Sequence, residues 1–96
     1  MTNQAKITNQ DTKELYEAIL KLQSVDECKK FFRDLCTLSE INDMTERYKV
    51  VKMVEGGVPY REISKKIGSS TATITRVAHW LHHGKGGYKL VLKRVK

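Results

Sequence analysis

Apolar residues recur every three or four positions in the first half of the chain, and this spacing constrains the fold more than any other feature. Within residues 11–23, Leu15, Ile19 and Leu22 follow this spacing, and charged residues lie between them. Because an α-helix has 3.6 residues per turn, such residues share one face. The pattern predicts an amphipathic helix over residues 11–23 and an all-α fold.

Two capping signals predict the next helices. In a capping box, a Ser or Thr side chain accepts the backbone N–H three residues later, and a Glu at that position accepts the N–H of the cap. Ser24 with Glu27, and Thr37 with Glu40, have this spacing, and each pair opens a segment with an apolar face. We therefore predict a second helix directly after Ser24 and a third over residues 38–55, in a dimerisation scaffold that spans residues 11–57.

The segment from about Pro59 to His83 fits a helix-turn-helix. Proline suits a first helical turn, so a short helix is predicted over residues 59–67. Residues 68–70, Gly-Ser-Ser, supply a glycine for a sharp bend and a serine to cap the next helix, which is predicted over residues 71–82. The positions that must face inward hold small or branched residues, namely Ile63, Ser64, Ile67, Ile74 and Val77.

The positive charge is concentrated in the same part of the chain. The net charge is +7, yet residues 1–57 hold nine Lys or Arg against ten Asp or Glu. Residues 58–96 hold nine Lys or Arg against the single Glu62. A basic surface of this kind suits a polyanion, because each cation placed on a phosphate releases counterions. A nucleic acid and an anionic membrane both fit this charge. The helix-turn-helix pattern in the same segment favours nucleic acid, and we expect double-stranded DNA as the partner.

The outward side of this motif holds the candidate DNA-binding residues. Short side chains let a helix approach base edges closely in the major groove, and longer cations reach phosphates. The candidates are Arg61, Lys65, Lys66, Gly68, Ser69, Ser70, Thr71, Ala72, Thr75, Arg76 and His79.

Three segments carry a resemblance to a known family. They are Ala72-Thr73-Ile74-Thr75-Arg76, Arg61-Glu62-Ile63, and Thr37-x-x-Glu40 at the start of a long helix that contains Arg47. From about Leu35 to Leu81 the chain resembles the Trp repressor family, and within it the short YerC/YecD-type group. The resemblance implies six helices and an interlaced homodimer. It also implies that Thr71, Ala72 and Thr75 face operator bases, while Arg61 and the turn at 68–70 contact base or phosphate.

The resemblance also marks a possible effector pocket. Thr37, Arg47 and Arg76 match family residues that hold a tryptophan corepressor. Val77 and Trp80, however, stand where the family has a glycine and a serine, and both would intrude on the ring's space. We expect no cofactor and no metal site, consider a small-molecule corepressor possible, and expect that tryptophan is not the effector. Ion pairs or phosphate contacts of Arg47 and Arg76 are the alternative interpretation.

The remaining expectations concern the two ends of the chain. We expect residues 1–10 to form a flexible tail, residues 11–96 a single helical domain, and residues 84–96 a basic segment ending in a short helix. Trp80 and Leu81 are predicted to lie in the core. Residues 1–10 are polar and no apolar stretch is long enough to span a membrane, so a cytoplasmic location without membrane contact is expected.

These features together predict a transcriptional regulator, acting as a repressor, that binds specific DNA sequences. No residue combination of a catalytic site is present, so the chain is not expected to be an enzyme. Two alternatives stay open: a replication- or recombination-associated DNA-binding module, and an interaction module that docks an acidic protein.

Overall fold

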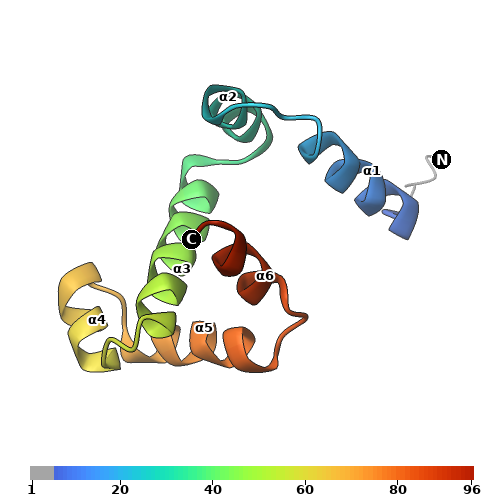
Figure 1. Cartoon of the computed structure of the whole chain (residues 1–96). Coiled ribbons are helices and arrows are strands. Elements are labelled where there is room, and N and C mark those ends of the chain that lie inside the picture. The colour runs from blue at the N-terminus through green and yellow to red at the C-terminus, as the bar shows by residue number, and fades with distance from the viewer. Residues whose placement is uncertain (1–5) are drawn as a thin grey trace. The chain divides into compact units, whose positions relative to one another are not determined.

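The computed structural model describes residues 6–96, and this part of the chain contains six α-helices and no strand (Figure 1). The helices are α1 (Asn9–Ile19), α2 (Val25–Leu35), α3 (Leu38–Glu55), α4 (Tyr60–Ile67), α5 (Thr71–His83) and α6 (Gly87–Arg94). The all-α prediction is confirmed. None of these helices is both long enough and apolar enough to cross a bilayer.

The chain divides into two units after Thr37. The N-terminal unit holds α1 and α2, and the C-terminal unit holds α3 to α6. This division falls inside the segment 11–57 that was expected to form the dimerisation scaffold. The single domain expected over residues 11–96 therefore stays a prediction.

Helix α1 begins and ends earlier than predicted. Thr8 and Asp11 form a capping box, in which the Thr8 Oγ1 accepts the Asp11 N–H at 3.1 Å and the Asp11 Oδ2 accepts the Thr8 N–H at 2.9 Å. This cap starts the helix at Asn9, inside the expected tail. Residues 1–5 of that tail lie outside the described residues. The helix ends at Ile19, four residues before the predicted end.

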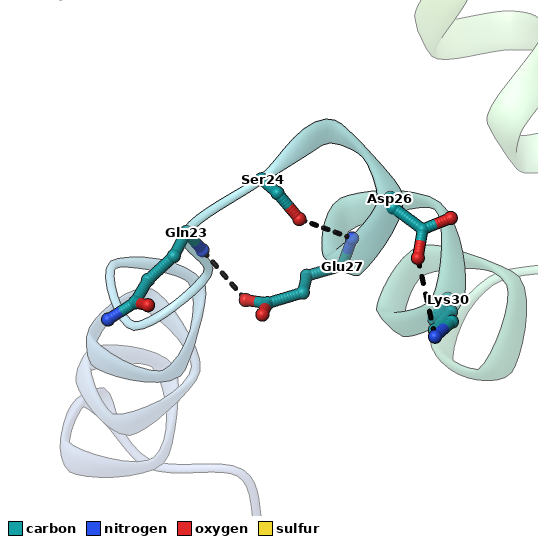
Figure 2. A network of polar contacts seen from close by, with 5 residues as sticks. All are labelled: Gln23, Ser24, Asp26, Glu27 and Lys30. Carbon is teal, nitrogen blue, oxygen red and sulfur yellow. Dashed lines mark hydrogen bonds and ion pairs between the residues drawn. The ribbon is translucent and has the colours of Figure 1, made fainter.

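Helix α2 begins at the predicted cap, with one change in its bonding (Figure 2). The Ser24 Oγ accepts the Glu27 N–H at 3.1 Å, as a capping box requires. The Glu27 carboxylate accepts the N–H of Gln23 at 2.8 Å, one residue before the cap. Asp26 and Lys30 add an exposed ion pair one helical turn apart. The predicted start of α2 is confirmed. The bond accepted by the Glu27 carboxylate comes from Gln23 and not from the cap residue Ser24.

The core of the C-terminal unit joins all four of its helices. Its buried apolar side chains are Val50 and Val51 from α3, Ile63 from α4, Ile74, Val77 and Leu81 from α5, and Leu92 from α6. Helix α5 lies across the C-terminal half of α3 and also packs on α4 and α6 (Figure 1). The pair α4 and α5 is therefore supported by α3 and held by a shared apolar core.

The end of the chain forms the predicted final helix. Gly86 has a φ of 87°, a left-handed conformation that glycine adopts readily, and α6 begins at the next residue. Leu92 of α6 enters the core, and Tyr88 packs against it. Burial of Leu92 on one face of α6 explains why this basic segment is helical.

Candidate nucleic-acid interface

Helices α4 and α5 are joined by a turn of three residues, as the sequence predicts. Pro59 is the residue before α4, and its carbonyl accepts the N–H groups of Glu62 and Ile63 at 3.0 Å each. Gly68 ends α4 with a φ of 84°, and its N–H donates to the Ser64 carbonyl at 2.8 Å. The Ser70 Oγ accepts the Thr73 N–H at 3.1 Å and so caps α5.

The inward and outward sides of this helix pair are separated by burial. Ile63 and Ile74 have no exposed surface, and Val77 is 2% exposed. Ser64 and Ile67 are partly buried. Most of the candidate DNA-binding residues are exposed, namely Arg61, Lys65, Lys66, Gly68, Ser70, Thr71, Ala72, Thr75, Arg76 and His79. The structure thus leaves these residues of α4, the turn and α5 accessible to a partner.

Ser69 differs from the other candidates. Its side chain is 6% exposed, and its hydroxyl donates to the Glu46 carboxylate on α3 at 2.6 Å. A buried hydroxyl that is already bonded to a carboxylate is not offered to a DNA phosphate in this conformation. A DNA contact of Ser69 stays a prediction, and in this conformation it would be made by the main chain.

Several exposed groups make local bonds that limit what they offer. The Thr75 Oγ1 donates to the Thr71 carbonyl at 2.8 Å, which leaves its methyl group and its lone pairs for an approaching base. Lys66 forms an exposed ion pair with Glu62 at 3.4 Å. The His79 ring lies edge-on to the Trp80 ring, with 5.2 Å between centroids.

A cavity of about 530 Å³ lies between α3, α5 and α6. It brings together Arg47 and Arg76, as expected for the effector pocket, and Val77 and Trp80 also line it. Thr37, the third residue of that expectation, belongs to the N-terminal unit, whereas this cavity is described by residues of the C-terminal unit.

Four lining residues were not anticipated, namely Asp43, Glu46, Thr73 and Tyr88. Asp43 lies four residues before Arg47, and this spacing places both on one helix face. The spacing could therefore have identified Asp43 as a lining residue. Glu46 has no such signal, because its bonding partner lies 23 residues away. The two carboxylates balance the two guanidinium groups, so the lining has no net formal charge.

The prediction that Trp80 lies in the core is wrong. Its side chain is 54% exposed, whereas Leu81, for which burial was also predicted, is 3% exposed. Consecutive residues on a helix point about 100° apart, so Leu81 reaches the core while Trp80 reaches the cavity rim.

Comparisons with known proteins find relatives across most of the chain. Residues 10–96 match the family described as Trp repressor protein. The chain is 40% identical over 91 residues to YerC, an uncharacterized protein of Bacillus subtilis strain 168, with 95% of this chain and 88% of YerC covered. A Trp operon repressor homolog of Chlamydia trachomatis serovar D is 39% identical over 66 residues, covering 64% of this chain and 70% of that protein.

A solved structure agrees with these sequence relatives. The crystal structure of a TrpR-like protein from Eubacterium eligens ATCC 27750 matches with a TM-score of 0.87 at 40% identity, and the match covers 93% of this chain and 92% of that chain. Sequence and fold agree, and the chain belongs to the Trp repressor family.

Proposed function

We propose that this chain is a transcriptional regulator, acting as a repressor, that binds specific sequences of double-stranded DNA through α4 and α5. One observation carries the proposal: α5 exposes Thr71, Ala72 and Thr75 on one side while Ile74 and Val77 anchor its other side in the core. A rigidly anchored helix with short outward side chains suits the major groove, which is about 12 Å wide and admits an α-helix.

The neighbouring groups suit the DNA backbone. Arg61, Lys65 and Lys66 extend from α4, the helix that precedes the reading helix. The first N–H groups of α5 are the positive end of its dipole, and such helix ends bind phosphate. Family membership adds support, because the chlamydial relative is described as a Trp operon repressor homolog.

We further propose that the regulator acts as a homodimer. Neither α1 nor α2 has a buried residue in the single chain, and Leu20 and Val25 are 81% and 79% exposed. Two amphipathic helices whose apolar residues are exposed or only partly buried need a covering surface, and a second copy supplies one with matching faces. Two reading helices related by a two-fold axis would address half-sites about 34 Å apart.

We also propose that tryptophan is not the effector of this protein. Val77 and Trp80 take up part of the cavity wall, and the carboxylates of Asp43 and Glu46 line the same cavity as the guanidinium groups of Arg47 and Arg76. A ligand carboxylate would therefore meet two carboxylates as well as two guanidinium groups in this lining. The volume itself falls in the usual range for small-molecule sites, so the proposal rests on the residues of the cavity wall, and another small-molecule effector is compatible with it.

Selection of bound sequences from random duplex DNA tests the proposed function directly. We expect a recurring two-fold symmetric sequence, bound with an affinity that falls steeply as salt is raised. Salt-sensitive binding without any sequence preference would contradict the proposal, and so would preferential binding to an acidic protein. Occupancy of promoters in the cell would separate regulation from a replication- or recombination-associated role.

A further inference from the structure

Two hydrogen bonds of Ser69, one through its side chain and one through its carbonyl, hold the turn between α4 and α5. The Ser69 hydroxyl donates to Glu46 Oε2 on α3 at 2.6 Å. The Ser69 carbonyl accepts the Ser64 hydroxyl of α4 at 2.6 Å. Ser69 therefore ties the turn to both the preceding helix and the supporting helix.

The bond to Glu46 is a strong one by its geometry. An O–H···O⁻ distance of 2.5 to 2.7 Å is typical of a charge-assisted hydrogen bond. Ser69 is also the one polar side chain that is buried among residues 6–96, so water competes little for its hydroxyl. Both observations indicate that this contact restrains the turn.

Steric packing does not restrain Gly68, the first residue of the turn, in the same way. Gly68 has a φ of 84°, and no atom lies within 4 Å of the position that its Cβ would take. The space beside Gly68 is open, so neighbouring atoms do not hold this residue in place. Of the three turn residues, only Ser69 is bonded to α3 through its side chain.

We propose that Glu46 is a positioning residue for DNA recognition, which holds Ser69 and thereby sets how the first turn of α5 is presented to the bases. The inference rests on the proposed DNA-binding function. Glu46 acts through Ser69 and does not itself contact DNA.

Removal of the Glu46 carboxylate should change DNA affinity in opposite directions if Glu46 positions the turn and if it acts only through its charge. A carboxylate behind a phosphate-binding turn repels DNA, so its removal by charge alone would strengthen binding to every sequence. Positioning has the opposite consequence for the cognate site. Loss of the bond frees the turn, and the preference for the cognate over a scrambled duplex falls while binding to the scrambled duplex holds or rises.

The experiment measures the ratio of dissociation constants for scrambled and cognate duplexes at one salt concentration. Glu46→Ala should lower this ratio about tenfold, the usual scale for a lost hydrogen bond to a charged group. Glu46→Gln keeps an oxygen that accepts from Ser69, so its ratio should stay within about twofold of the unchanged protein. The matched control is Asp43→Ala, which removes a carboxylate from the same helix and cavity wall but makes no bond to the turn in the described structure.

Ser69→Ala removes the hydroxyl that donates to Glu46 and changes the size of the side chain little. It therefore tests the same bond if Glu46→Ala does not fold. It should lower the ratio as Glu46→Ala does, and the double variant should lose little more than either single variant. Circular dichroism at the assay temperature verifies that each variant is folded. A ratio unchanged in Glu46→Ala, or lowered equally in Asp43→Ala, would overturn the inference.

A second readout keeps the inference separate from the proposed function. The N–H groups of Gly68, Thr73 and Ile74 are hydrogen-bonded at the two ends of the turn. Their exchange in the free protein should be about tenfold faster in Glu46→Ala than in Asp43→Ala. If the unchanged protein shows no sequence preference, the proposed function fails, and exchange alone then decides whether Glu46 holds the turn. Equal exchange in the two variants would overturn the inference.

Discussion

Ser69 and Ser70 are neighbours with the same side chain, and the fold places them in opposite environments. Ser70 is exposed and caps α5, whereas Ser69 is 6% exposed and bonds to Glu46. Serine is a favoured cap residue, and this local preference alone does not decide which of the two serines caps α5. The contact with α3 decides between them, because only one of the two hydroxyls reaches the carboxylate.

The exposed side of α5 leads to a prediction about base recognition. Thr75→Ala and Ala72→Asp should each lower the cognate-to-scrambled affinity ratio about tenfold, the scale of a lost base contact, because both positions face outward. Thermal denaturation should change little, since neither side chain is buried. Competition binding with the two duplexes measures the ratio, and equal loss for both duplexes would show that the reading side is misassigned.

The cations of α4 lead to a contrasting prediction. Lys65→Ala should weaken binding to all sequences alike and reduce the slope of log affinity against log salt by about one, as a phosphate contact does. Lys66→Ala should have a smaller effect, because Glu62 already pairs with Lys66 in the free protein. A salt titration of both variants checks this, and a selective loss at the cognate site would contradict it.

Asp11 gives a prediction about pH. The Thr8 N–H and hydroxyl donate to its carboxylate and hold the pKa of Asp11 below its ordinary value of 3.8. The cap therefore stabilises the start of α1 at pH values above 3.8, and this contribution is lost as pH falls through the lowered pKa. NMR of the Thr8 and Asp11 amides should show fraying in that acid range, and Asp11→Asn should remove the pH dependence. Fraying that begins near neutral pH would exclude this cause.

At the scale of elements, helix boundaries follow caps more closely than apolar periodicity. Helices α2 and α3 begin where their Ser or Thr with Glu signals predict. Helix α1 begins at Asn9 because Thr8 and Asp11 form a capping box that the periodicity of the apolar residues does not reveal. A cap satisfies backbone N–H groups that have no partner in the helix, and this local gain sets the starting residue.

The joint between α4 and α5 gives a prediction about stability. Gly68→Ala should destabilise the fold by about 1 kcal/mol, because a φ of 84° is strained for a residue with a Cβ. The matched control is Gly87→Ala in the first turn of α6, where an added Cβ also meets open space but no positive φ is required. That change should be neutral or stabilising. Urea denaturation measures both, and equal effects would refute the assigned cause.

At the scale of the whole molecule, the two units differ in how they bury apolar surface. The C-terminal unit encloses a core of residues from four helices, whereas α1 and α2 have no buried residue. A chain of 96 residues can bury only a limited apolar surface. Leaving the apolar surface of two helices exposed to water therefore removes a large part of the stabilisation. This imbalance is the physical basis for the proposed dimer.

Sedimentation should therefore show a species of about twice 11.0 kDa at micromolar concentration, with and without DNA. The dimer should persist when salt is raised, because apolar contacts are not screened. A monomer under these conditions would rule out the interlaced arrangement.

The cavity leads to a prediction about the effector. Calorimetry with tryptophan should show no micromolar binding, and tryptophan should not change DNA affinity, because overpacking by Val77 and Trp80 typically costs about 1 to 3 kcal/mol. Trp80→Ser removes the indole from the cavity rim and serves as the comparison variant. Micromolar affinity coupled to tighter DNA binding in the unchanged protein would contradict the proposal.

The sequence by itself determined the features that depend on near neighbours. Apolar spacing and capping pairs predicted the helix over residues 38–55, and Gly68 predicted the bend between two short helices. Ile63, Ile74 and Val77 were assigned inward by periodicity, and all three are buried. Such features are encoded within a few residues, because hydrogen bonds and side-chain directions in a helix repeat locally.

The tertiary structure alone decided which distant residues meet. It paired Glu46 with Ser69 across 23 residues, turned Trp80 toward a cavity and Leu81 toward the core, and placed Tyr88 on the cavity wall. Each outcome depends on the angle at which α3, α5 and α6 pack. That angle is set by the simultaneous packing of many side chains from different helices. No local stretch of sequence specifies this packing.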